Sequence, residues 1–326
     1  MSEPARGSGR FGDGLTNSQV LLLAAAIVLP GLAPTMFGWL TGLLAIPVFA
    51  ILVLHGTARG SILIRNGVLI ACGAALFLKL FGSLLFALTL IPLGYSFQRS
   101  AATGTGEWKT VLHGALYLGA GWLLFWMVYG TVEGVQPYQH LLKLIDDGFA
   151  QTYEYYREQG NLPADRQLYL EQAVNETRRL VPLLLPGVLC GTVILTVWLN
   201  LMGGIYLLNR VRPGHLHWKE FSRWRLPDWL VWPAIGAGIL LLIGGKGSAT
   251  LALTLVQVCG LLYFFQGLAV FIHLLERWKV PRTLRLLFYV MLIVQSYGLL
   301  LLAILGLADV WVDFRRRTEP PAQAGD

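Results

Sequence analysis

The sequence predicts an all-α protein, a polytopic transmembrane helical bundle of about eight or nine membrane helices with an extramembrane amphipathic helical hairpin. Charged residues make up only 13% of the 326 residues, against about 25% in soluble domains, and the mean hydropathy is +0.60. A soluble chain with so little charge would not cover its surface with polar groups. The apolar residues also gather in runs comparable to the roughly 20 residues that span a bilayer core.

Nine apolar stretches are candidate membrane crossings. They cover residues 19–33, 36–55, 61–78, 80–97, 108–130, 181–208, 229–244, 248–275 and 286–308. A domain organisation follows from their positions. It consists of a disordered N-terminal tail at 1–18, about five membrane helices within 19–130, an extracytoplasmic amphipathic segment at 131–180, about four membrane helices within 181–314, and a disordered C-terminal tail at 315–326.

The segment between the fifth and sixth apolar stretches has a different character. Residues 131–180 hold eight acidic residues against five lysines or arginines. From Tyr138 to Tyr156, apolar and aromatic residues recur at the three- and four-residue spacing of one helix face. Gly160 ends this pattern, and Pro163 suits the first turn of a second helix. We expect a hairpin of two helices at the membrane interface, which either covers the bundle or serves as a gate or a partner-docking element.

The charges of the loops orient the chain in the membrane. Residues 209–228 carry five lysines or arginines against two acids, and residues 276–285 carry four against one. Because basic loops stay on the cytoplasmic side, we expect both inside, with 131–180 outside and the N-terminus inside. This predicts a multi-pass protein of the bacterial cytoplasmic (inner) membrane. The same loops account for the net charge of +7, so nucleic acid is not an expected partner.

The last apolar stretch, 286–308, conflicts with this orientation because it runs into GLADVWVDFRRR at 306–317. A single crossing would place the three arginines outside. A bend near 295–298 would return them to the cytoplasmic side, but each arm would then be about 24 Å long, short of a bilayer core of about 30 Å. Length therefore favours a single helix, which we expect, whereas charge favours the bend. The sequence leaves the side of the tail open.

Several polar residues inside the apolar runs are candidates for an intramembrane pocket. A polar side chain in hydrocarbon is costly, so it faces the protein interior or a cavity. Such residues either link helices by hydrogen bonds or line a solute site, and both interpretations stay open here. The candidates are Asn200, Gln257, Gln266, Gln295 and Asp309.

Asp309 and Asp313 stand four residues apart, which places them on one face of a helix. A pair of this kind is typical of a proton or cation site. Because Arg315, Arg316 and Arg317 follow at once, we favour a helix end that acid–arginine pairs anchor at the membrane surface. Exposed pairs of this type contribute little to stability.

The sequence contains no recognisable set of residues for catalysis or metal binding. Its histidines and cysteines lack the spacing of metal ligands, and no nucleophile–base set can be assembled. GGKGS at 244–248 lacks the pattern of a phosphate-binding loop. We therefore expect no enzyme activity, no cofactor and no nucleotide site. Three pairs of small residues predict close helix approach. They are Gly187 with Gly191, Ala115 with Gly119, and Gly236 with Gly238.

Four motifs taken together carry a family resemblance. They are NLMGGIYLLNR at 200–210, WRLPDWLVW at 224–232, FFQGLAVF at 264–271 and GLADVWVDFRRR at 306–317. Over about residues 17–317 the chain resembles the YybS-like family of predicted bacterial multi-pass membrane proteins of unknown function. The N-terminal part of that family is distantly similar to the substrate-binding membrane subunits of energy-coupling-factor vitamin transporters. Those subunits bind a ligand and dock on a separate ATPase module, through small residues spaced along the first helix.

The resemblance implies solute binding, although the chain departs from the pattern of those subunits. It has more than their six crossings, and Ala24, Ala25 and Ala26 are consecutive rather than spaced. Our first hypothesis is a solute-binding or transport-like membrane component, with a pocket at Asn200, Gln266 and Asp309. Its expected partners are the lipid bilayer, a small-molecule solute, and a membrane or ATPase partner protein. The alternative is a non-transporting scaffold or assembly factor for an envelope complex.

Overall fold

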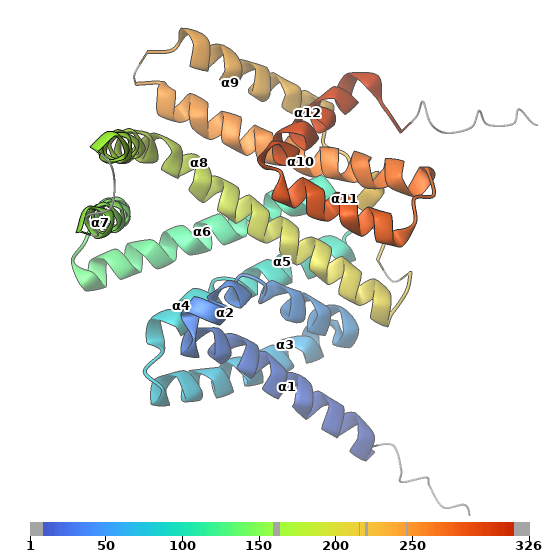
Figure 1. The fold of residues 1–326 in the computed structure, drawn as a ribbon. Helices are drawn as coiled ribbons and strands as arrows, with labels where there is room; N and C mark the ends of the chain where they lie inside the picture. Colours follow the sequence, from blue (N-terminus) through green and yellow to red (C-terminus); the bar gives the residue numbers. More distant parts are fainter. Residues whose placement is uncertain (1–8, 159–163, 215, 219–220, 246, 316–326) are drawn as a thin grey trace, which may run out of the picture. The chain divides into compact units, whose positions relative to one another are not determined.

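The structure is a computed structural model that describes residues 9–158, 164–214, 216–218, 221–245 and 247–315. The described residues form helices and connecting turns, with no β-strand among them, as the all-α prediction requires (Figure 1). The chain folds as two compact units. The N-terminal unit comprises Met1–Glu133 and Val193–Trp218, and the C-terminal unit comprises Gly134–Thr192 and Lys219–Asp326.

The N-terminal unit packs six helices and the second part of a seventh around one apolar core. Its helices are α1 (Gly9–Leu32), α2 (Pro34–Thr41), α3 (Ala45–Phe77), α4 (Phe81–Leu88), α5 (Ile91–Ala102), α6 (Glu107–Glu133) and the end of α8 (Ala164–Val211). At the centre lie the fully buried rings of Phe49 and Phe97, whose centroids are 5.8 Å apart in an edge-to-face arrangement. Such aromatic pairs contribute beyond the apolar area that they bury.

Helix α3 turns back on itself at Gly56, which has φ 76° and ψ 163°. A side chain disfavours this conformation, whereas glycine adopts it readily. A Cβ at Gly60 would lie 3.1 Å from the Cα of Leu52, so the two arms of α3 are in backbone contact. The turn falls between the predicted crossings 36–55 and 61–78. At the turn, His55 Nε2 and Gln19 Oε1 are 2.7 Å apart, which connects α3 to α1.

The C-terminal unit is built on the pairing of two long helices. Helix α10 (Ala249–Arg277) packs along both α12 (Ser296–Val312) and α9 (Val231–Ile243). Figure 1 shows α9 and α10 side by side. The other elements of the unit are α7 (Pro137–Glu158), the first part of α8, the short 3₁₀ helices η1 (Phe221–Arg223) and η2 (Asp228–Leu230), and α11 (Arg282–Val294).

Helix α8 is one uninterrupted helix of 48 residues, so the boundary expected between 180 and 181 does not exist. Pro182 and Pro186 lie inside it. Its charged first part lies beside α7, and residues of both helices line one cavity (Figure 1). Arg178 of α8 and Asp146 of α7 form an ion pair of 2.6 Å.

Five described helices are long and apolar enough to cross a membrane, fewer than the eight or nine expected. They are Ala45–Phe77, Phe81–Ala102, Glu107–Glu133, Leu168–Val211 and Ala249–Arg277. A bent pair in the last part of the chain would make six. The difference arises because Asn17–Leu32 and Asp228–Ile243 are too short, and because the one helix Ala45–Phe77 takes in part of 36–55 and nearly all of 61–78. The protein is a multi-pass membrane protein with several apolar helices.

The last apolar stretch is not the single helix that its length suggested. Helices α11 and α12 meet at Gln295 with a bend of 106°. Gln295 has an extended backbone, with φ −85° and ψ 114°. Gly298 lies so close to Leu292 that an added Cβ would overlap its carbonyl oxygen. The polar stretch that the sequence proposed as a bend is therefore the break. Of the predicted tails, 1–8 and 316–326 lie outside the described residues, whereas α1 already begins at Gly9.

Candidate functional site

Two glycines bring the backbones of α10 and α12 into contact. A Cβ at Gly267 would overlap the carbonyl oxygen of Leu302, and a Cβ at Gly306 would overlap that of Tyr263. Small residues at helix interfaces allow this close approach. Gln266 precedes one glycine, and Asp309 lies one turn after the other, so the contact brings these two polar side chains together. The sequence reasoning singled out both polar residues but neither glycine.

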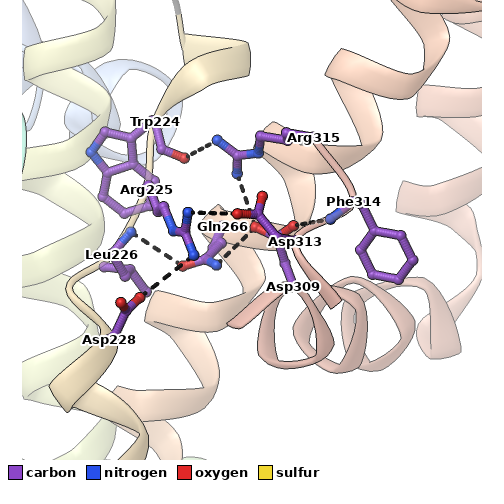
Figure 2. Close-up of polar contacts among 9 residues, drawn as sticks. All are labelled: Trp224, Arg225, Leu226, Asp228, Gln266, Asp309, Asp313, Phe314 and Arg315. Atoms are coloured by element: carbon purple, nitrogen blue, oxygen red, sulfur yellow. Dashed lines mark hydrogen bonds and ion pairs between the residues drawn. The ribbon is translucent and has the colours of Figure 1, made fainter. Parts of the chain in front are cut away.

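Asp309 is buried, with 1% of its side chain exposed, and its carboxylate is the centre of the polar cluster in Figure 2. Its Oδ2 accepts a hydrogen bond of 3.1 Å from Gln266 Nε2 and lies 3.5 Å from Arg315 Nη2. Its Oδ1 accepts a hydrogen bond of 3.1 Å from the backbone N–H of Phe314. Gln266 Oε1 in turn accepts a hydrogen bond of 3.2 Å from the backbone N–H of Leu226. Both carboxylate oxygens and both ends of the amide are therefore bonded.

Two arginines from different segments complete this polar cluster. Arg315 Nη1 donates 2.8 Å to the backbone carbonyl of Trp224, and Arg225 Nη1 lies 3.2 Å from Asp313 Oδ2 (Figure 2). Burial lowers the pKa of the Arg315 guanidinium and the Asp309 carboxylate raises it. Because arginine ionises so far above neutrality, Arg315 stays charged. The cluster is a network of paired charges and amide hydrogen bonds around a buried carboxylate.

In this cluster, the start of the C-terminal tail lies against the segment that precedes α9. Asp313 pairs with Arg225, and Arg315 donates to the carbonyl of Trp224. A single straight crossing at 286–308 would not predict this contact, whereas the bend at Gln295 is compatible with it. Three of the four motifs that carry the family resemblance thus meet at one place.

Asp309 and Asp313 do not share one helix face, contrary to what their spacing predicted. Helix α12 ends at Val312, and Asp313 has a left-handed backbone with φ 45°. Asp309 is buried in the cluster, whereas Asp313 is 23% exposed and pairs with Arg225. Arg315 is 13% exposed and therefore lies largely inside the protein instead of anchoring the tail at the surface. Arg316 and Arg317 lie outside the described residues.

The remaining candidate polar residues make other contacts. Asn200 belongs to the N-terminal unit, where it is fully buried and its Nδ2 donates to the carbonyls of Gly42 and Thr196. Gln257 is half-buried in α10, against the backbone at Gly187. Gln295 is exposed at the break between α11 and α12. Within the C-terminal unit, Gln266 and Asp309 are the two predicted residues that bond to each other.

The predicted small-residue contacts are met in part. Gly187 faces Gln257 of α10, as a close approach requires. In α6 the tight contact is at Gly114, against Val197 of α8, one residue from the predicted Ala115. Among the described residues, no atom outside the local helix lies within 4 Å of a Cβ built at Gly236 or Gly238.

Two neighbouring cavities lie between α5 and α6 in the N-terminal unit, where the sequence reasoning placed no site. One, of about 250 Å³, is lined by Ser96, Arg99, Ser100, Thr103, Thr105, His113 and Tyr117. The other, of about 540 Å³, is lined by Ile91, Pro92, Tyr95, Ser96, Gln98, Arg99 and Tyr117. They share three lining residues, and we call them together the α5–α6 groove. Asn200, Gln266 and Asp309 line neither cavity.

Two serine hydroxyls that line the groove have no partner among the described residues. Ser96 and Ser100 are 7% and 4% exposed, and neither hydroxyl has a hydrogen-bond partner within the part of the chain that the structure describes. Ser96, Arg99, Ser100 and Thr103 follow the three- and four-residue spacing of one helix face. That periodicity is the sequence signal that would have revealed the site. No group of three or more metal-ligating side chains occurs among the described residues.

The comparisons with known proteins identify the family. A family model described as "Predicted membrane protein (DUF2232)" matches residues 20–310, which is most of the chain, so the chain belongs to this family. No curated protein and no solved structure matches it. The description of the family and the five long apolar helices both indicate a multi-pass protein embedded in a lipid bilayer.

Proposed function

We propose that this member of the DUF2232 family of predicted membrane proteins is a solute-binding, transport-like component, with its binding site in the α5–α6 groove. The observation that carries the proposal is the pair of serine hydroxyls that line the groove without a hydrogen-bond partner among the described residues. Their oxygens are accessible from the groove, so they can bond to a molecule that enters it. A bound molecule would supply the missing partners.

The shape and lining of the groove support this interpretation. Small-molecule sites are concave, of about 300–1,000 Å³, and mostly apolar with a few polar groups that fix orientation. The larger cavity has about 540 Å³ and combines Ile91, Pro92 and two tyrosines with one arginine. By contrast, the cluster around Asp309 satisfies its own carboxylate and amide. The proposal therefore moves the solute site from Asn200, Gln266 and Asp309 to α5 and α6.

The groove is proposed to open near the cytoplasmic surface of a bacterial inner membrane. Trp218 Nε1 donates 2.8 Å to the backbone carbonyl of Thr105, so the turn between α5 and α6 lies beside the end of the 209–218 segment. That segment begins the arginine-rich loop, which the distribution of basic residues assigns to the cytoplasm together with the N-terminus. Because the sequence offers no nucleotide-binding motif, transport would need a separate energising partner, such as an ATPase.

Untargeted mass spectrometry of small molecules that co-purify with the full-length protein tests this function. We expect a metabolite to accompany the wild type and to be lost from Ser96→Leu, whose larger apolar side chain projects into both cavities and removes a hydroxyl. Asn200→Ala and Gln266→Ala are controls that should retain it. If no metabolite follows the folded wild type, solute binding is wrong. If Ser96→Leu retains the metabolite while Asn200→Ala or Gln266→Ala loses it, the pocket predicted from the sequence at Asn200, Gln266 and Asp309 is the binding site.

The scaffold interpretation is the second candidate, and exposed aromatic residues favour it. Tyr155 at the end of α7 and Tyr169 near the start of α8 are 60% and 72% exposed, and Leu168 is exposed beside them. Aromatic residues of this kind are enriched at protein–protein interfaces. A scaffold would retain a stable protein partner through purification, but no small molecule, so the same preparation separates the two functions.

A further inference from the structure

The lining of the α5–α6 groove specifies the charge of its ligand. Arg99 lines both cavities, and His113 lines the smaller one. No aspartate or glutamate is among the described residues that line either cavity. The positive charge of Arg99 therefore has no fixed counter-charge among the residues that line the groove. The groove therefore favours an anionic group.

The hydroxyls specify where that anionic group binds. Ser96 and Ser100 are one helical turn apart, and Arg99 lies between them in the sequence on the same face of α5. Hydroxyl and guanidinium groups together offer several hydrogen-bond donors to the oxygens of a phosphate or carboxylate. Thr103 is not needed for this role, because its Oγ1 donates to the carbonyl of Arg99. The anion-binding end of the groove is thus at Ser96, Arg99 and Ser100.

The opposite end of the groove is apolar, and it lies beside Tyr117 of α6, which is exposed on the surface of the protein. Ile91, Pro92 and Tyr95 line only the larger cavity, away from Ser100 and His113. On α6, Leu116 and Tyr117 are 63% and 50% exposed. An acyl chain that lies in this apolar end would continue into the hydrocarbon without crossing water.

We propose that the ligand is an amphiphile with a phosphate or carboxylate head and an acyl chain. Its head would bind Ser96, Arg99 and Ser100, and its chain would lie along Ile91, Pro92 and Tyr95. The proposal rests on the solute-binding function above and adds to it the chemical class of the solute. It also gives the route of entry, which is laterally from the bilayer.

Native mass spectrometry of the detergent-purified full-length protein tests the proposal with four probes. They are dioleoyl phosphatidic acid, oleate, dioleoylglycerol, and glycerol 3-phosphate. We expect the first two to bind, dioleoylglycerol to bind weakly because it lacks the anion, and glycerol 3-phosphate to bind weakly because it lacks the chains. Arg99→Gln should weaken phosphatidic acid binding about tenfold or more, because a hydrogen bond to a charged group is lost. Ser96→Ala should weaken it severalfold.

Lys109→Gln is the matched control, since it removes one positive charge from the first turn of α6 without touching the groove. It should change binding by less than about twofold, in line with a screened surface charge. Equal loss in Lys109→Gln and Arg99→Gln would mean non-specific attraction and would overturn the proposal. Equal binding of dioleoylglycerol would also overturn it while leaving solute binding intact. Tight binding of glycerol 3-phosphate alone would identify a water-soluble anion as the ligand and exclude the amphiphile.

Discussion

The polar cluster of the C-terminal unit and the α5–α6 groove of the N-terminal unit both consist of polar side chains on apolar helices. They differ in whether these side chains find hydrogen-bond partners inside the protein. In the cluster, Asp309 and Gln266 use both ends of their side chains to bond other parts of the same chain. In the groove, the hydroxyls of Ser96 and Ser100 line a cavity and bond to no other described residue.

The comparison separates two uses of polarity in a membrane protein. A buried charge in a membrane segment is by default a functional hypothesis. Such a charge stabilises a particular packing when its partners are internal, and it points to a ligand when they are missing and space is available. Asp309 is the more buried charge, but Ser96 and Arg99 have the features of a binding site. The following three predictions test the internal side of this comparison, since the ligand side is tested by the binding experiments above.

The largest effect is expected where the cluster is assembled, at the contact between α10 and α12. Gly267→Ala places a Cβ on the carbonyl oxygen of Leu302 and close to the backbone N of Gly306. Backbone cannot rotate away as a side chain can, so the helices must separate, at a cost of about 3 kcal/mol of unfolding free energy. Titration of the purified protein with sodium dodecyl sulfate in mixed micelles measures this loss.

Gly260→Ala is the matched control because it makes the same substitution in the same helix. Among the described residues, no atom outside the local helix lies within 4 Å of a Cβ built at Gly260. Alanine there should stabilise α10 by about 0.5–1 kcal/mol, since it restricts the unfolded chain. If Gly267→Ala proves as harmless as Gly260→Ala, the two backbones are not in contact and the cluster has another origin.

The second prediction concerns the charge at the centre of the cluster. Asp309→Asn removes the anionic partner of Arg315, which is only 13% exposed, and should destabilise the protein by about 2 kcal/mol. Arg315→Gln alone should also destabilise it, because it leaves the carboxylate without its cation. In the double variant the two losses should be less than additive by about 1 kcal/mol. Strict additivity in the same unfolding titration would show that the pair does not interact.

Much of the fold could be predicted from the sequence because hydropathy and helical periodicity are local properties. The all-α class, the break between 36–55 and 61–78, and the amphipathic residues of α7 follow from them. The boundary at 180/181 was placed where the charged segment gives way to an apolar run, but helix α8 continues across it. Within a membrane helix, neighbouring groups satisfy the backbone carbonyl that proline leaves free, so α8 continues through Pro182 and Pro186.

The two sites were predictable to different degrees. Gln266, Asp309 and Arg315 were visible as polar residues, but their partners lie 40 to 91 residues away, at Leu226 and Trp224. Contacts at that separation depend on tertiary packing, which no single-sequence pattern encodes. The groove was missed for a local reason. The fourth crossing was ended at residue 97 although α5 continues to Ala102, so its polar residues were not recognised as one helix face.

The smallest effect is expected at Asp313, the acid that the spacing made equivalent to Asp309. Its ion pair with Arg225 is partly exposed, with side chains 23% and 38% accessible, and contributes less than about 1 kcal/mol. Its φ of 45° disfavours most side chains by about 1–2 kcal/mol, a penalty that glycine avoids. Asp313→Gly should therefore be nearly neutral, because relief of backbone strain offsets the lost pair, whereas Asp313→Ala should lose about 1 kcal/mol. The hydrogen bond from the backbone N–H of residue 313 to the carbonyl of Asp309 remains in both variants. Equal losses for glycine and alanine in the unfolding titration would mean that the carboxylate of Asp313 matters more than its backbone, and that the two acids act as one pair after all.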